Sequence, residues 1–373
     1  MLKLAFKFIL YDKPKSFGAL LGIVISTFLI GQQSGIFLFL TGSMSRLVDN
    51  IPAALWVVDS KTTNVNAMGQ IDMRITREIE SIAGVARVYP LVIASSSARL
   101  PDGKTSGITL VGSQAPHFRG GPWNITDGKI ENLLNDGCVS TDYFDRRALS
   151  FIKVGDIFEI GGKKVQMGLY TKGARGFGGI YVFTTIDRAR FLGKVPPNKV
   201  SALLVDLEQG VDTLAVREKI NTAIYGVKAW TNKDFSRSTV ATVLSSSGIA
   251  ISIGTMIVFA IISGLVIIGL TLYSAAIDRI KDYGTMKAIG ATNAYITKLI
   301  LLQAFILALI GYAIALVLLE LFRSGIANAG TIFAYTPLMR LAFFGITLTL
   351  SLTGSLFAIF RIRKIEPASV FRL

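Results

Sequence analysis

The sequence contains very little of the side-chain chemistry on which metal centres and covalent catalysts depend. Its 373 residues include one cysteine, Cys138, and one histidine, His117. An intramolecular disulfide is therefore impossible, and a Cys/His zinc site or a Cys/His nucleophile pair has too few residues. A Ser-His-Asp triad would have to use His117, which stands in the Pro- and Gly-rich run APHFRGGPW. We therefore expect a chain with no catalytic residues, no metal site and no cofactor of its own.

Charged residues are also scarce, at 17%, whereas apolar residues make up 51% of the chain. The mean hydropathy of +0.54 is too high for a soluble globular protein of this size. Four apolar runs reach the roughly 20 residues that a helix needs to cross a bilayer. We therefore expect a membrane protein with transmembrane helices at 17–40, 247–276, 296–322 and 338–360.

The basic residues predict how these helices are oriented. Lys and Arg outnumber Asp and Glu by 39 to 24, which gives a net charge of +15. They cluster in the N-terminal tail 1–16, the loop 277–295 and the C-terminal tail 361–373. Positive charge beside membrane helices marks the cytoplasmic side of the inner membrane. We therefore expect both termini and this loop in the cytoplasm, and 41–246 and the loop 323–337 outside it, with no need for nucleic acid to explain the charge.

The stretch 41–246 has the pattern of an extracytoplasmic α+β domain. Five segments have the composition of strands: 54–60, 108–113, 154–171, 179–185 and 201–207. Gly161 and Gly162 predict a hairpin turn inside the third segment. Helical spacing occurs at 75–85 and 211–224. The segment 114–150 has no clean periodicity, and we interpret it as an inserted lobe.

Both ends of this domain are predicted to be helical stalks. Residues 41–50 can continue the first membrane helix. From Asp234 the pattern is helical into the span 247–276, and no proline occurs between Asp234 and residue 337. Between the stalks, GARGFGG at 173–179 has no helix behind it that would favour a phosphate site, and we expect a mobile or partner-binding loop.

The most informative segment is RIKDYGTMKAIGAT, residues 279–292, directly after the second span. On helical spacing Tyr283, Met286 and Ile289 fall near one another, and small residues between them permit close approach of another backbone. This is the composition of a docking helix, although an ordinary interfacial turn would have a similar one. The residues expected to contact a partner are Arg279, Asp282, Tyr283, Gly284, Met286, Lys287, Ala288, Ile289 and Gly290.

This run resembles the cytoplasmic loop of FtsX/MacB-type ABC transporter permeases, where an Arg, an acidic residue and a Gly precede a (Lys/Arg)-Ala-(Ile/Leu)-Gly-Ala sequence. The tail RIRKIEPASVFRL resembles the basic tail of the same family, which ends in an acidic residue, Pro, two further positions, two apolar residues and Arg. The residues that match it are Glu366, Pro367, Val370, Phe371 and Arg372. With one helix, a large outer domain and three more helices, the resemblance covers essentially the whole chain. The run 169–185 and the Lys-Ala-Ile-Gly loop look most like the DevC-like branch, whose permeases work with a separate ATPase and a periplasmic adaptor.

The resemblance implies the fold class of an α+β membrane protein with four transmembrane helices and a MacB-like domain between the first two. It also implies a homodimer that binds an ABC ATPase, and this chain contains no G-x-x-x-x-G-K-[ST] motif. ATP and Mg are therefore expected in a partner chain. In such permeases, ATP-driven closure of the ATPase would push on the cytoplasmic loop and move the outer domain, with an adaptor and an outer-membrane channel exporting a lipid, peptide or drug-like substrate. The absence of charge from the middle of the four spans agrees with this mechanotransmission.

Small residues at a spacing of four suggest where helices approach one another closely. The pairs are Gly18 and Gly22, Gly31 and Gly35, and Ala260 and Gly264. They could form a homodimer interface or pack within one protomer, and the sequence does not choose between the two.

Other functions also fit the sequence. Within the family these are extrusion of haem or lipid from the membrane and regulation of a cell-wall hydrolase. A membrane sensor or scaffold without a transport partner belongs to a different class. A neighbouring ATPase gene would argue against the sensor.

Overall fold

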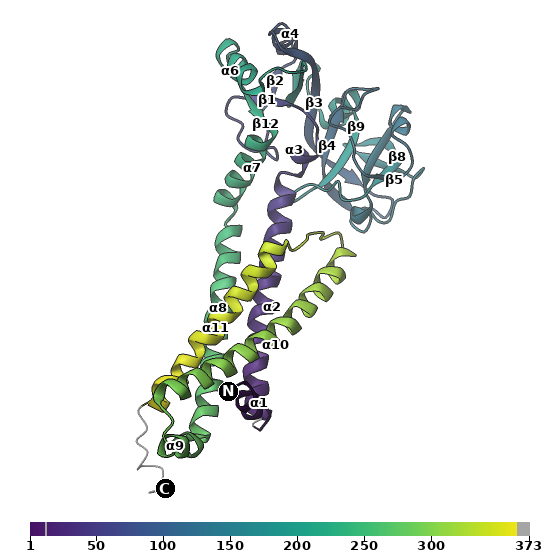
Figure 1. Cartoon of the computed structure of the whole chain (residues 1–373). Helices are drawn as coiled ribbons and strands as arrows, with labels where there is room; N and C mark the ends of the chain where they lie inside the picture. The colour runs from purple at the N-terminus through teal and green to yellow at the C-terminus, as the bar shows by residue number, and fades with distance from the viewer. Residues whose placement is uncertain (12, 364–373) are drawn as a thin grey trace. The chain divides into compact units, whose positions relative to one another are not determined.

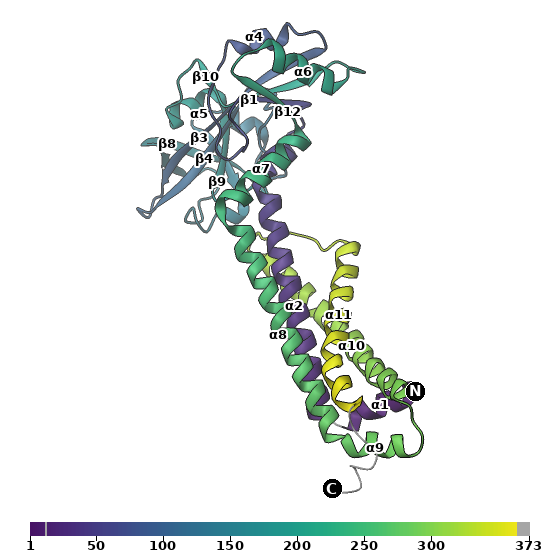
Figure 2. The same ribbon diagram turned by 90° about the vertical axis from the view of Figure 1, so that its left-hand side faces the viewer.

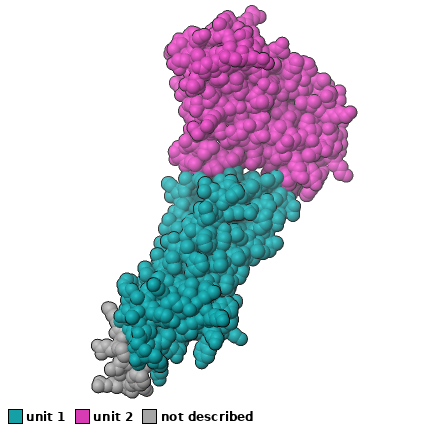
Figure 3. Space-filling model, in the orientation of Figure 1, with its two compact units in different colours: residues 1–39, 249–373 teal, residues 40–248 magenta. Residues whose placement is uncertain are grey.

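The computed structural model describes residues 1–11 and 13–363, and the chain divides into two compact units (Figures 1 and 3). Residues 1–39 and 249–373 form what we call the helical unit, and residues 40–248 form the sheet unit. The predicted tail motif at Glu366, Pro367, Val370, Phe371 and Arg372 lies outside the described residues.

Within the described residues, four helices are long and apolar enough to cross a membrane. They are α2 (Lys13–Met44), α8 (Ile249–Asp278), α10 (Asn293–Ala327) and α11 (Pro337–Arg363). The expected spans 17–40, 296–322 and 338–360 each lie inside one of these helices, and 247–276 overlaps α8 from Ile249. Two short helices, α1 (Leu2–Tyr11) and α9 (Ile280–Ala288), lie at the same end of the helical unit (Figure 2).

The small residues of α2 pack against other segments of the same protomer. A methyl group added at Gly22 would lie 2.6 Å from Ile267 of α8, and one at Gly18 would lie 3.3 Å from Thr271. The other partners also belong to this chain: Leu319 faces Gly31, Phe333 and Tyr335 face Gly35, and Ser26 faces Gly264, while Ala260 is buried. A homodimer interface on α2 or α8 would therefore have to use other residues.

The sheet unit is built on a ten-stranded sheet with a two-stranded sheet beside it. The order in the large sheet is β12 (Val227–Thr231), β1 (Leu55–Asp59), β11 (Ala202–Leu207), β3 (Val85–Arg99), β4 (Thr105–Ser113), β9 (Ile180–Thr185), β6 (Cys138–Asp142), β8 (Lys163–Thr171) and β5 (Ile125–Asp127), with β7 (Ile157–Ile160) paired to β3 and β8. The small sheet joins β10 (Lys199–Val200) to β2 (Ile71–Asp72). The helices are α3 (Arg46–Asn50), α4 (Ile75–Glu80), α5 (Ile186–Gly193), α6 (Thr213–Ala223) and α7 (Asn232–Ser247), with 3-10 turns at Ile130–Leu134 and Tyr143–Asp145.

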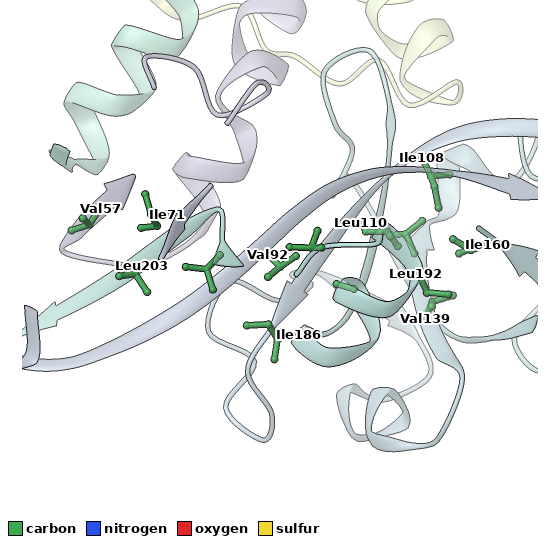
Figure 4. Packing of buried hydrophobic residues seen from close by; sticks show 14 of the residues in the cluster. Val57, Ile71, Val92, Ile108, Leu110, Val139, Ile160, Ile186, Leu192 and Leu203 are labelled. Atoms are coloured by element: carbon green, nitrogen blue, oxygen red, sulfur yellow. The ribbon is translucent and has the colours of Figure 1, made fainter. Parts of the chain in front are cut away.

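Both faces of the central strands are buried. Successive side chains of a strand point to opposite faces, and in β1 Leu55 and Val57 join one hydrophobic cluster while Trp56 and Val58 join another. Figure 4 shows part of the first cluster, including Val57 itself. Burial on both sides explains why such strands are continuous apolar runs in the sequence and do not alternate with polar residues.

The predicted hairpin is confirmed, and the predicted lobe is wrong. Gly161 and Gly162 join β7 to β8 with φ of 58° and 76°, the left-handed conformations that a tight hairpin turn requires. The segment 114–150 does not form a separate lobe, because β6 within it pairs with both β8 and β9 in the large sheet. Its irregular sequence reflects short strands and 3-10 turns.

The stalks are less continuous than the sequence predicts. On the second connection, α7 ends at Ser247 and α8 begins at Ile249, because Gly248 takes the left-handed conformation with φ of 66°. Glycine adopts this conformation without a steric penalty, so it commonly ends a helix. On the first connection α2 continues to Met44, and α3 starts after a break at Ser45.

Candidate functional site

The segment 279–292 folds as a short helix followed by a tight turn. The N–H of Gly290 donates to the carbonyl oxygen of Lys287 at 3.0 Å, and that of Ala291 donates to Met286 at 2.9 Å. With φ of 103° at Gly290, this is the Schellman arrangement that ends a helix at glycine. Thr292 then caps α10, since its Oγ1 accepts from the N–H of Tyr295 at 3.2 Å. The run Ile-Gly-Ala-Thr therefore stops one helix and starts the next.

The turn divides the predicted contact residues into an outward and an inward set. The outward residues are Asp282, Ala288, Ile289 and Gly290, together with Lys281 and Thr285. Ile289 is the prominent one, because 83% of its surface is exposed at the point where α9 ends. The inward residues are Arg279, Tyr283 and Gly284, which are buried, and Met286 and Lys287, which are half-buried.

Tyr283 belongs to the core of this chain. It is 2% exposed, packs in one cluster with Leu299 and Ile359, and its ring centroid lies 5.9 Å from that of Phe8. Burial raises the pKa of Tyr283 to about 12. The prediction that Tyr283 contacts a partner is therefore corrected. Helical spacing placed it near Met286 but could not show that α1, α10 and α11 cover that face.

Two of the three cations of the motif, Arg279 and Lys287, also bind within the chain. Arg279 donates from Nη2 to the carbonyl oxygen of Phe8 and lies over the Phe8 ring at 4.7 Å. Lys287 donates from Nζ to the carbonyl oxygens of Ile362 and Arg363 at 3.1 and 3.4 Å. A cation is favourable at these last carbonyls of α11 because they carry the negative end of the helix dipole. The prediction that Arg279 and Lys287 contact a partner is corrected accordingly, since both donate to carbonyl oxygens of this chain.

The contact of α1 with Arg279 was missed by sequence reasoning, which treated 1–16 as a charged tail. The helical signal of α1 is the recurrence of Leu2, Phe6 and Leu10 at intervals of four, with Lys3 and Lys7 between them. The structure places this helix against α9 through the Phe8 contacts described above.

The GARGFGG loop is anchored at its start. The N–H of Ala174 donates to Oδ2 of Asp142 at 2.7 Å, and Nε of Arg175 donates to Oδ1 of Asp145 at 2.8 Å. Asp142 is fully buried and Asp145 is 4% exposed. Burial outweighs the nearby Arg175 and raises the pKa of Asp145 to about 6. The first half of the loop is therefore anchored to buried carboxylates, and partner binding by this loop stays a prediction.

Comparison with known proteins identifies the family. Residues 16–223, more than half of the chain, match the family model of the MacB-like periplasmic core domain, and residues 254–367 match the FtsX-like permease C-terminal model. The chain belongs to the FtsX/MacB-type family of ABC transporter permeases. It is a multi-pass membrane protein, and the predicted family and fold class are confirmed. The segment 279–292 lies inside the FtsX-like match.

Individual relatives are distant. The uncharacterized ABC transporter permease MJ1507 of Methanocaldococcus jannaschii is 26% identical over 205 residues, which cover 53% of this permease and 49% of the relative. The chain thus spans about half the length of that curated relative.

Two solved structures are also similar. The periplasmic region of MacB from Actinobacillus actinomycetemcomitans has 9% identity and a TM-score of 0.38, and covers 54% of this chain and 99% of its own. The extracellular domain of the noncanonic ABC-type transporter YknZ from Gram-positive bacteria has 14% identity and a TM-score of 0.36. The match covers 48% of this chain and 99% of the YknZ domain.

Proposed function

We propose that this permease is a non-catalytic subunit that binds a separate ABC ATPase chain through the outward face of the α9 turn. The observation that carries the proposal is the 83% exposure of Ile289 at the junction of two capped helices. An isoleucine held there gains from burial in a partner, since full burial of such a side chain contributes roughly 1.5–3 kcal/mol. Apart from its two chain neighbours, no described residue has an atom within 4 Å of the Cβ position of Gly290, so a partner has room to approach.

The inward residues support transmission of force from this turn. Tyr283 packs among α1, α10 and α11, and the cluster around it also includes Ala276 of α8. Arg279 ties α9 to α1, and Lys287 ties it to the end of α11. Packed interiors are dense and have low compressibility. A push on Ile289 would therefore move the end of the helical unit as one body.

The finer parts of the proposal rest on the family and on the sequence. We place the turn and both termini in the cytoplasm and the chain in the inner membrane, because of the positive charge there. ATP and Mg would bind in the partner ATPase, since residues 1–373 contain no phosphate-binding G-x-x-x-x-G-K-[ST] motif. The cycle would move the sheet unit of a homodimer and, in the DevC-like manner, act with a periplasmic adaptor and an outer-membrane channel to export a lipid, peptide or drug-like molecule.

The test is co-purification in mild detergent. The wild-type chain is expected to retain an ATPase. The Ile289→Asp chain should retain at least about tenfold less ATPase, because an apolar contact becomes a desolvated charge. Leu214→Asp is the matched control, since Leu214 is 53% exposed on α6 of the sheet unit. Equal retention by all three chains would remove the turn as the binding site. No ATPase with the wild type would favour the sensor or scaffold.

A further inference from the structure

The helix α1 has three faces, and packing within the chain accounts for one of them. The residues turned toward the rest of the helical unit are Leu4, Ala5, Phe8 and Ile9. A second face consists of Leu2, Phe6 and Leu10, which are 65%, 48% and 51% exposed. At i, i+4 and i+8 these three side chains form one continuous apolar stripe. The third face carries the exposed Lys3 and Lys7.

The apolar stripe continues the surface of a membrane-spanning helix. Leu2, Lys3 and Phe6 line one open groove of about 370 Å³ together with Ile306 of α10. On α10, Phe305 and Leu309 flank Ile306 in the sequence and are 40% and 49% exposed. Exposed side chains on a helix apolar enough to cross the membrane face acyl chains. The groove therefore joins the α1 stripe to a lipid-facing surface.

The charges of α1 indicate the kind of lipid. Among the residues of α1 the charged side chains are Lys3 and Lys7, and none is acidic. Lysine buries its methylene chain along an apolar surface while its ammonium group stays at the headgroups. A helix with an apolar stripe beside cations lies in the plane of the interface and is attracted to anionic lipid.

We infer that α1 is a lipid-binding element of the permease, with Leu2, Phe6 and Leu10 among the acyl chains of one leaflet and Lys3 and Lys7 on the phosphates of anionic phospholipids. The same helix holds the α9 turn through Phe8, whose carbonyl oxygen accepts from Arg279. Anionic lipid would thus stabilise the helix against which the turn is packed. This inference does not depend on any ATPase.

The test uses the full chain in nanodiscs and tryptophan emission quenched by brominated acyl chains. The native tryptophans, Trp56, Trp123 and Trp230, all belong to the sheet unit and give the background. Phe6→Trp is expected to be quenched at least about twice as strongly as Tyr11→Trp, because Tyr11 is 87% exposed beyond the lysine face of the same helix. Leu10→Trp, on the stripe, provides a second variant and is expected to behave like Phe6→Trp.

Lipid charge is tested in the Phe6→Trp chain by placing the bromines on phosphatidylglycerol or on phosphatidylcholine at the same mole fraction. Brominated phosphatidylglycerol is expected to quench about twofold more, and Lys3→Gln with Lys7→Gln should abolish that difference. Lys281→Gln with Lys298→Gln removes the same charge from α9 and α10 and should preserve it. The inference is overturned if the Phe6→Trp and Tyr11→Trp chains are quenched equally, if both stripe variants escape quenching because water or another protein covers the stripe, or if the two lipids quench the Phe6→Trp chain alike.

Discussion

Different kinds of residue stabilise the interior of each of the two units of this permease. In the sheet unit the largest fully buried side chains include Trp56, Phe183 and Phe235. In the helical unit close contacts form at glycines: an added methyl group would collide with Ile267 of α8 at Gly22, and with Phe333 and Tyr335, in the connection before α11, at Gly35. Water drives the burial of large apolar groups, whereas lipid tails are as apolar as the side chains, so that close packing has to supply helix association. Removal of atoms should damage the first unit and addition of atoms the second.

The buried polar groups differ in the same way. The helical unit uses hydroxyls, such as the Thr27 and Thr347 Oγ1 atoms 2.9 Å apart and Ser351 Oγ at 2.8 Å from the carbonyl oxygen of Ala304. The sheet unit buries the carboxylates Asp142 and Asp145. Charge is costly inside a bilayer, whereas a water-soluble fold can bury a carboxylate beside an arginine. Stability should therefore depend on pH chiefly in the sheet unit.

The largest effect is expected for removal of a core ring from the sheet unit. Phe183 is fully buried, with ring centroids of Trp123 and Tyr181 at 5.4 and 6.0 Å. Phe183→Ala should lower the free energy of unfolding by about 3–5 kcal/mol because it leaves a cavity. Denaturant unfolding followed by tryptophan emission reports on this unit. Phe191→Ala, at a residue 61% exposed, should change it by less than about 1 kcal/mol, and similar losses in both variants would refute the assignment of the core.

The pH dependence of the sheet unit is next in size. The pKa of Asp145 is raised from 3.8 to about 6, so the folded state binds the proton more tightly than the unfolded state. The Asp145 contribution is therefore most favourable at low pH and is lost as pH rises from about 4 to about 6, by up to roughly 3 kcal/mol. Subtracting the unfolding curve of Asp145→Asn from that of the wild type should isolate this loss. Asp187→Asn, at an exposed carboxylate on α5, should leave the wild-type pH dependence unchanged.

How far the sequence predicts this structure depends on whether the signal is local. The apolar runs of β1 and β11 predict strands because both of their faces are buried. The 15-residue β3 was missed, since it contains Pro90 and its last third, Ser95–Arg99, is mostly polar and exposed. The spacing of the 279–292 motif predicts a helix. Its orientation depends on Phe8 and on α11, which are distant in the sequence, so the exposure of Ile289 and the burial of Tyr283 could not be derived.

Adding one methyl group should have an effect of intermediate size in the helical unit. The Cβ of an alanine at Gly35 would lie 2.5 Å from the Phe333 ring, so Gly35→Ala should cost about 1–3 kcal/mol by overpacking. Gly42 lies on the same helix, and no described atom outside the adjacent residues and backbone of α2 lies within 4 Å of its Cβ position, so Gly42→Ala should cost nothing. Thermal loss of helical circular dichroism in detergent compares the two. Equal stabilities would contradict the view that glycines set the packing of this unit.

The smallest effect concerns the two connections between the units, which differ in where the helix is interrupted. The first is the helix α2, which is unbroken as far as Met44, whereas the second is interrupted at Gly248, whose φ of 66° is left-handed. Gly248→Ala should strain this conformation by about 1 kcal/mol and favour an unbroken helix from α7 into α8. Hydrogen exchange at 246–251 should then slow about fivefold in the variant. Gly254→Ala, inside α8 where no described atom would meet the methyl group, is the control for the general helix preference of alanine. On the proposed function, Gly248→Ala should retain the ATPase in pull-down and, if the break at Gly248 is used during transport, should transport more slowly than Gly254→Ala. A Gly248→Ala chain with slowed exchange but normal transport would show that the break at Gly248 is not needed for transport.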